Sequence, residues 1–150
     1  MGLQRDVYLV ASTGHELGFW GMHRFMETAD ARVLDAALWV HFGASIGAAV
    51  NPRAMFAAST EPLRKLTAAM AAEAGLTELN LLAPPAAPAG ESGIIHARGG
   101  NYVSFLGSSD HFHLQTDRWP SAVDLDVVES YCVLVAGILE DVDRSPAILG

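Results

Sequence analysis

Short apolar runs that favour strands alternate along this chain with longer segments of helical period, and this alternation limits the possible folds most strongly. Five runs predict strands: residues 7–11, 36–44, 77–82, 94–96 and 102–106. Three segments with apolar residues at helical spacing predict helices: residues 16–28, 61–74 and 124–142. The pattern predicts one α/β domain, a three-layer α/β/α sandwich with a mixed, mostly parallel sheet. The run at 7–11 lacks polar alternation, which is typical of a strand buried on both faces.

The composition indicates which partners suit the chain. Of the 150 residues, 17 are acidic and 9 are Lys or Arg, a net charge of −8, so nucleic acid and anionic membranes are poor partners. No segment reaches the roughly 18 apolar residues of a membrane span. The single cysteine, Cys132, lies in an apolar run, where a buried thiol is expected. The compartment stays open, with the cytoplasm slightly favoured.

Metal-capable side chains gather after two of the predicted strands. His15 and Glu16 follow the first strand. Four more follow the last: Asp110, His111, His113 and Asp117. Ligands of open α/β sheets bind at the carboxyl ends of strands, and in an extended segment His111 and His113 would point to the same side. Carboxylates and imidazoles together suit zinc.

The His15-Glu16 pair does not fit the zinc motif of a single helix. That motif requires a second histidine one turn after the first, where this chain has Phe19. His23 shares roughly one helix face with His15, but on a helix it lies about 12 Å away along the axis. A single ion cannot bridge that distance, so another arrangement is needed.

Two longer segments resemble the two-zinc exopeptidases of metallopeptidase family 28. "VASTGHELGFWGMHRF" (10–25) is similar to the family's segment in which a strand ends in a Gly-acid-Glu-Leu-Gly turn and starts a helix. "SSDHFHLQTDRWPSAVDLDVVESYCVLVAGIL" (108–139) resembles its closing segment, with Phe-His-x-x-x-Asp, a short loop, an Asp and a long final helix. The order and the spacing both match, over roughly residues 6–142.

The resemblance implies roles for four residues. Glu16 matches a zinc ligand, and His113 matches the last histidine ligand of the same ion. Asp117 matches an aspartate that orients the histidine ligand or orders its loop. His15 stands where active members have a glutamate as general base; an imidazole can accept a proton at neutral pH but carries no negative charge.

Other parts of the family's site have no match here. The resemblance implies an aspartate ligand near residues 36–44, where only His41 is available; a hydrogen-bonded core histidine is the alternative reading of His41. A further histidine and a metal-bridging aspartate come from strands before the Gly-acid-Glu turn. We therefore expect residues 1–150 to be the C-terminal portion of a zinc-exopeptidase-like domain, with the sheet incomplete at its N-terminal side. The mean hydropathy of +0.25 indicates that a missing N-terminal part or a partner chain covers apolar surface.

The sequence thus predicts a zinc-dependent exopeptidase-like hydrolase of the aminopeptidase type, in which metal-activated water attacks a peptide or small amide substrate. The alternative is a catalytically inactive exopeptidase-like module used for binding or assembly, which His15 in the base position favours. A metal-free α/β domain is a third possibility, but no GxSxG elbow, P-loop or GxGxxG motif follows a predicted strand.

Overall fold

The computed structural model describes residues 2–77, 79–83 and 87–149. In these ranges the chain forms a four-stranded sheet from β1 (Trp39–Phe42), β2 (Arg53–Ala58), β3 (Leu79–Leu81) and β4 (Tyr102–Ser108). The strand order is β1-β4-β2-β3. The pairs β1·β4 and β2·β3 are parallel, and the central pair β2·β4 is antiparallel. The predicted mixed, mostly parallel sheet is confirmed.

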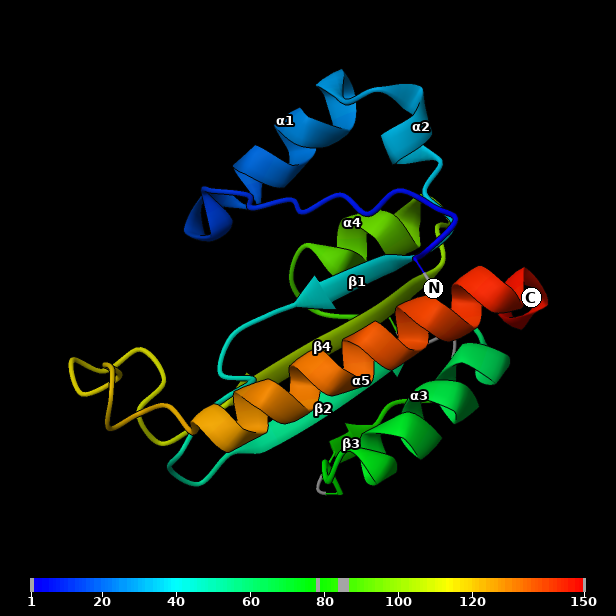
Figure 1. Ribbon diagram of the computed structural model, residues 1–150. Coiled ribbons are helices and arrows are strands. Elements are labelled where there is room, and N and C mark those ends of the chain that lie inside the picture. Colours follow the sequence, from blue (N-terminus) through cyan, green and yellow to red (C-terminus); the bar gives the residue numbers. More distant parts are fainter. Residues whose placement is uncertain (1, 78, 84–86, 150) are drawn as a thin grey trace.

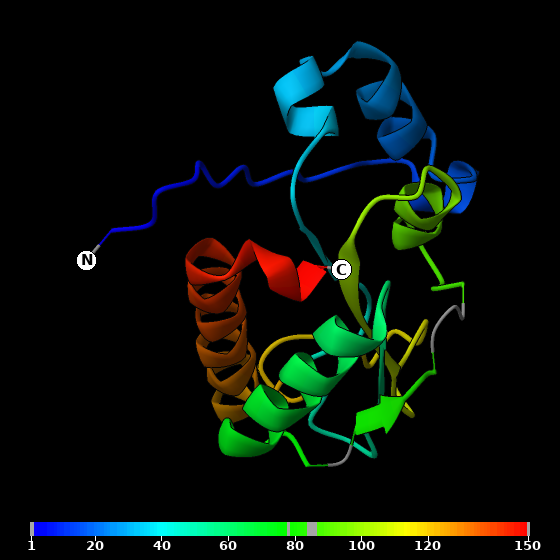
Figure 2. The ribbon, with the colours of Figure 1, turned by 90° about the vertical axis from the view of Figure 1, so that its right-hand side faces the viewer.

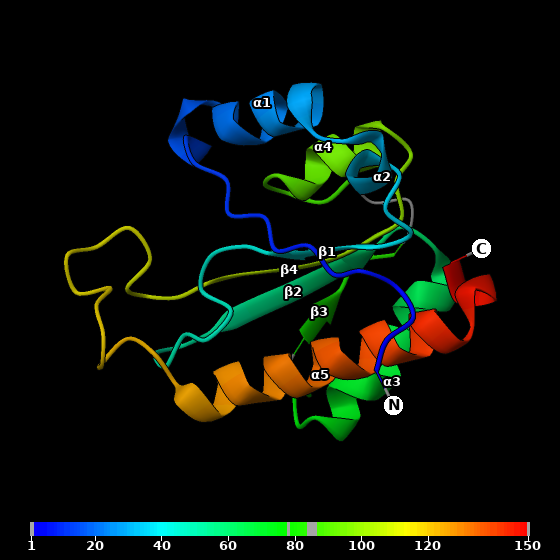
Figure 3. The ribbon, with the colours of Figure 1, turned by 45° about the horizontal axis from the view of Figure 1, so that its top comes forward.

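Helices cover both faces of this sheet (Figures 1 and 3). One face carries α3 (Glu61–Glu73) and α5 (Leu125–Arg144), and the short 3-10 helix η2 (Pro146–Leu149) follows α5. The other face carries α4 (Ser92–Ala97), with α1 (Trp20–Thr28) and α2 (Ala31–Leu34) beyond it, and α1 is preceded by the 3-10 helix η1 (His15–Leu17). The α/β fold therefore has the predicted three layers. No helix in the described ranges is both long and apolar enough to cross a membrane.

Alternating side chains of β4 build a separate core on each face. Val103 and Phe105 pack into the cluster under α3 and α5, whereas Tyr102 packs with Met22 and Ile95 under α1 and α4. This follows from the two-residue period of a strand. Because both faces are covered, Tyr102, Val103 and Phe105 are all fully buried.

The predicted helices over 61–74 and 124–142 are confirmed, and local caps explain where they begin. The Thr60 side chain accepts a hydrogen bond from the backbone N–H of Leu63 ahead of α3. The Asp124 carboxylate accepts two from the backbone N–H groups of Asp126 and Val127 ahead of α5. The first backbone N–H groups of a helix have no carbonyl partner within the helix, and such caps satisfy them. A capping residue in the sequence therefore indicates where a helix begins.

The predicted buried strand at residues 7–11 is wrong. Figure 2 shows the N-terminal segment as an extended arm outside the sheet. Among the described residues nothing pairs with this run, and Leu9 is 97% exposed. A strand is stable only when a neighbour satisfies its backbone groups, and here that neighbour is missing. The start of the arm is tied down by Arg5, whose guanidinium donates to the Asp143 carboxylate of α5 at 2.9 Å.

Several other predictions differ from the structure. The predicted strand at 94–96 is helix α4, because a short apolar run without a strand partner can equally form a turn of helix against a sheet. Strand β2 and helix α2 were not predicted at all. The predicted helix over 16–28 begins only at Trp20, since Gly18 and Phe19 both have positive φ, 70° and 59°. Cys132 was expected to be buried but is exposed on the outer side of α5.

Strands predicted over 36–44 and 77–82 are present as the shorter β1 and β3, and the strand predicted over 102–106 extends to Ser108 in β4. The Pro-, Gly- and Ala-rich run over 83–93 predicts a loop; its residues 84–86 lie outside the described residues, and its last two residues belong to α4.

Candidate functional site

Glu16 lies in η1, a single turn held between two glycines. Gly14 and Gly18 on either side have φ of 71° and 70°, the left-handed region that glycine enters without strain. The backbone N–H of Leu17 donates to the Gly14 carbonyl at 3.0 Å and closes the turn. As a result the Glu16 carboxylate projects into solvent rather than into the body of the molecule.

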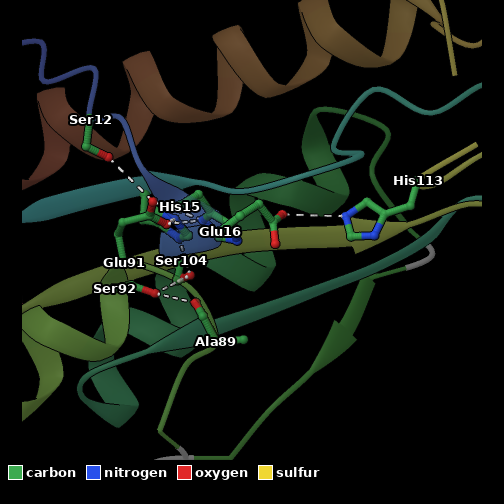
Figure 4. A network of polar contacts seen from close by, with 9 residues as sticks. Ser12, His15, Glu16, Ala89, Glu91, Ser92, Ser104 and His113 are labelled. Atoms are coloured by element: carbon green, nitrogen blue, oxygen red, sulfur yellow. Dashed lines mark hydrogen bonds and ion pairs between the residues drawn. The ribbon is translucent and has the colours of Figure 1, made fainter. Parts of the chain in front are cut away.

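His113 comes from the loop after β4 and meets Glu16 there. Its φ of 64° turns the chain, and its ring stacks on Phe112 with the ring centres 4.0 Å apart. Figure 4 shows the two side chains facing each other. The His113 Nε2 atom lies 3.9 Å from Glu16 Oε1, and the two side chains are 67% and 79% exposed. The fold thus brings together the two residues that the sequence predicts as ligands of one metal ion.

The other polar residues of this loop do not join them. His111 Nδ1 donates to the Thr116 carbonyl at 3.1 Å, so the expectation that His111 and His113 point to one site is wrong; the loop is a series of turns and not an extended strand. Asp117 orders the loop through its backbone N–H, which donates to the Leu114 carbonyl at 3.1 Å, while its carboxylate has no partner among the described residues.

Asp110 contacts Asn51 and Arg53, at the start of β2. Its carboxylate accepts hydrogen bonds from Asn51 at 2.6 Å and from Arg53 at 2.9 Å, and these bonds lower its pKa from the ordinary value. Asp110 is therefore used in fixing β2 against β4. Over the described ranges, no three His, Cys, Asp or Glu side chains are arranged to hold a metal ion.

His15 forms the second half of the site with a residue that the sequence did not point to. Its Nδ1 atom lies 3.0 and 3.1 Å from the two carboxylate oxygens of Glu91, and Ser12 donates to the same carboxylate at 3.4 Å. A carboxylate can only accept, so Nδ1 carries a proton, and in the neutral form of the ring Nε2 then keeps its lone pair. The edge of the Phe19 ring packs against the imidazole.

Behind Glu91 a chain of polar contacts runs into the sheet (Figure 4). His41 Nε2 on β1 lies 3.6 Å from Glu91 Oε2, and His41 Nδ1 is 2.8 Å from the hydroxyl of Ser104 on β4. The Ser104 hydroxyl is 2.9 Å from that of Ser92, which donates to the Ala89 carbonyl. His41 is therefore a hydrogen-bonded residue of the sheet that contacts Glu91.

The protonation of this chain follows from burial and contact. Burial acts to raise the pKa of Glu91, but the hydrogen bond from His15 and the charges of His15 and His41 outweigh it, so the pKa is lowered and the carboxylate is ionised. Burial lowers the pKa of His41 more than Glu91 raises it. His41 is therefore neutral at neutral pH.

Sequence reasoning missed Glu91 because its partners lie far away along the chain. One signal was available: Glu91 is the only Asp, Glu, Lys or Arg between positions 79 and 97, a stretch otherwise made of apolar, Pro, Gly, Ser and Asn residues and His96. A lone acid in such surroundings needs a polar partner from another part of the fold.

Comparison of the chain with known protein families, with curated proteins and with solved structures finds no match. The resemblance to the zinc exopeptidases therefore depends on the residues themselves and on where the fold brings them.

Proposed function

We propose that this chain supplies part of the site of a zinc-dependent, exopeptidase-like hydrolase, with Glu16 and His113 holding the metal and His15 as general base. One observation carries the proposal: Glu16 Oε1 and His113 Nε2 are 3.9 Å apart. Donor atoms that share one tetrahedral zinc ion, at bond lengths of about 2.0–2.2 Å, are separated by about 3.4 Å. Both side chains are exposed, so a small rotation suffices to bring them to that separation.

Two protein ligands leave the coordination of zinc incomplete. Since the described residues offer no third donor at this place, the remaining donors come from solvent or from another segment or chain. The exposed apolar run at residues 7–10 leads into η1, so a segment that covers this run would also approach Glu16. We propose that such a segment both covers the apolar arm and completes the site.

Zinc bound there would polarise the substrate carbonyl and lower the pKa of a bound water. The chain's own contribution is the proton transfer. Glu91 fixes the His15 ring through Nδ1–H, which leaves Nε2 to accept a proton from the attacking water and to pass it to the leaving amine. A carboxylate that orients an imidazole in this way stabilises the positive charge that the ring gains on protonation.

A second candidate function is a catalytically inactive exopeptidase-like module for binding or assembly. The observation that favours it is the lack of a third metal donor within the described parts of the chain. In that case Glu16 and His113 would form only a weak ion pair on the surface.

Zinc calorimetry tests the metal site. We expect binding by the wild type, loss of that binding in His113→Ala and Glu16→Gln, and wild-type binding in His111→Ala. The last variant is the matched control, because His111 lies in the same loop but bonds to the Thr116 carbonyl. Equal, negligible heats for the wild type and His113→Ala would remove the metal from the proposal.

Hydrolysis of a panel of aminoacyl-anilides, with added zinc or cobalt and with the segment or chain that completes the site, separates the two functions. Turnover that disappears in His15→Ala supports the hydrolase. Zinc binding without turnover of any substrate supports the inactive module.

A further inference from the structure

A pocket of about 360 Å³ opens between α1 and α4, beside the His15-Glu91 pair. One of its walls is Phe19, whose ring edge packs against the imidazole of His15. Another wall is Gly90, directly before Glu91 in the chain. The pocket is therefore separated from the His15 ring by Phe19, one of its own walls.

Most of the pocket is lined by apolar groups and bare backbone. Phe19, Ile94 and Ala97 supply the apolar side chains, and Gly90 and Gly93 supply none. Gly90 has φ of 74°, and a Cβ atom there would lie 3.2 Å from the His41 ring, so the wall at Gly90 cannot easily carry a side chain. The space that results suits an aliphatic or aromatic side chain of a ligand.

Two cationic or cation-forming residues, His23 and Arg98, line the same pocket. Seven of the chain's nine Lys and Arg residues form ion pairs with carboxylates. Among the described residues the side chains of Arg98 and Arg118 have no such partner, and of the two only Arg98 lines the pocket. In a chain with a net charge of −8, a guanidinium left unpaired at an apolar pocket can bind an anionic ligand without first breaking an ion pair.

We propose that this pocket binds a small apolar carboxylate, with the apolar group against Phe19 and Ile94 and the carboxylate on Arg98. The planar guanidinium pairs with a carboxylate through two parallel hydrogen bonds, which gives orientation as well as affinity. No acid of the described residues lines the pocket, and the nearby Glu91 pairs with His15 and forms no ion pair with Arg98.

The identity of this ligand as substrate rests on the proposed function. A carboxylate on Arg98, with its apolar side chain in a pocket that Phe19 separates from His15, places the free C-terminus of a peptide close to the general base. The substrates are then short peptides with a free carboxylate and an apolar C-terminal residue. C-terminal amides and aminoacyl-anilides carry no such carboxylate, so they would bind without the pairing with Arg98.

Binding can be measured without zinc and without turnover, so its outcome is independent of the metal site. N-acetyl-leucine and N-acetyl-leucinamide share the apolar group, but only the first carries a carboxylate. We expect saturable binding of N-acetyl-leucine to the full chain by nuclear magnetic resonance titration, and binding of the amide weaker by about tenfold or more.

Arg98→Gln should weaken the binding of N-acetyl-leucine by about tenfold or more, as expected for loss of a charge-assisted pair, and should leave the amide unaffected. Arg118→Gln is the matched control, an unpaired arginine outside the pocket, and should bind like the wild type. Ala97→Trp, at the exposed end of α4, should fill the pocket and abolish binding of both compounds.

Equal affinity of wild type and Arg98→Gln for N-acetyl-leucine would overturn the proposal. So would an equal loss in Arg118→Gln, which would indicate a general charge effect, or the absence of saturable binding. Circular dichroism of each variant verifies the fold. If the wild type binds N-acetyl-leucine but no zinc, the metal site is refuted and the proposal for the pocket stands.

Discussion

The sheet with its α3 and α5 layer and the N-terminal arm contain the same kinds of apolar residues, yet they differ completely in burial. Phe56, Phe105 and Ile138 are at most 1% exposed, whereas Leu9 in the arm is 97% exposed. The difference shows that an apolar, β-rich sequence becomes a strand only where a partner satisfies its backbone. The candidate site lies where the two regions meet: Glu16 comes from the end of the arm, and His41 comes from the sheet.

Truncation of one large side chain in each region should give the largest contrast. Ile138→Ala should lower the free energy of unfolding by about 2–5 kcal/mol, because it leaves a cavity in the buried cluster. Leu9→Ala should change it by less than about 0.5 kcal/mol. Urea denaturation measures both, and a comparable cost for Leu9→Ala would mean that the arm is packed in solution.

The hydrogen-bond chain of the site gives a second contrast, between two serines. Ser104→Ala removes a buried hydroxyl that contacts both His41 and Ser92, and should cost about 1–3 kcal/mol because those groups stay buried with one partner fewer. Ser12→Ala removes an exposed hydroxyl from the arm, 3.4 Å from Glu91, and should cost less than about 0.5 kcal/mol. Equal costs in thermal denaturation would contradict the division between buried and exposed halves of the site.

Thr67 of α3 offers a stabilising change within the buried layer. Its hydroxyl is buried and has no hydrogen-bond partner among the described residues. Thr67→Val keeps the shape and removes the unsatisfied group, so the free energy of unfolding should rise by about 1 kcal/mol. Thr28→Val is the control, at an exposed position of α1 where the hydroxyl donates to the Arg24 carbonyl. This change should not stabilise the protein. A destabilised Thr67→Val would show that the hydroxyl has a partner in solution.

The smallest expected effect is a pH slope from His41. Its pKa is lowered below the ordinary 6.5, so the unfolded chain binds this proton at a higher pH than the folded chain does. Stability should therefore be complete above about pH 6.5 and fall as the pH drops through the folded pKa. His41→Asn, which keeps a nitrogen near the position of Nδ1, should lose this part of the slope. Denaturation between about pH 5 and 7.5 tests it, because Glu91 titrates below its ordinary 4.5; an unchanged slope would exclude His41 as its source.

The elements that the sequence predicts well are those with local causes. Helices α3 and α5 are predicted by their capping residues, Thr60 and Asp124, and by apolar residues spaced three and four apart. Strand β2 was missed because "RAMFAA" is rich in alanine, and what makes it a strand is pairing with β4 on one side and β3 on the other. Those partner strands lie 21 or more residues away along the chain, so the local sequence of β2 does not indicate the pairing.

The candidate site divides in the same way. The order of the two segments that resemble zinc exopeptidases led us to expect Glu16 and His113 at one place, and the fold brings them to 3.9 Å. Glu91 could not be paired with His15 from the sequence, because the contact depends on the helical turn that α4 makes against the sheet. A loop predicted over 83–93 and a strand predicted over 94–96 gave no reason to bring residue 91 to η1.

The most direct test of the metal site is a crystal structure of the protein with zinc, with anomalous scattering measured at the zinc edge. We expect one peak at about 2.0–2.2 Å from both a Glu16 carboxylate oxygen and His113 Nε2. A zinc peak bound by other residues, or crystals in excess zinc with no peak between these two side chains, would contradict the proposal.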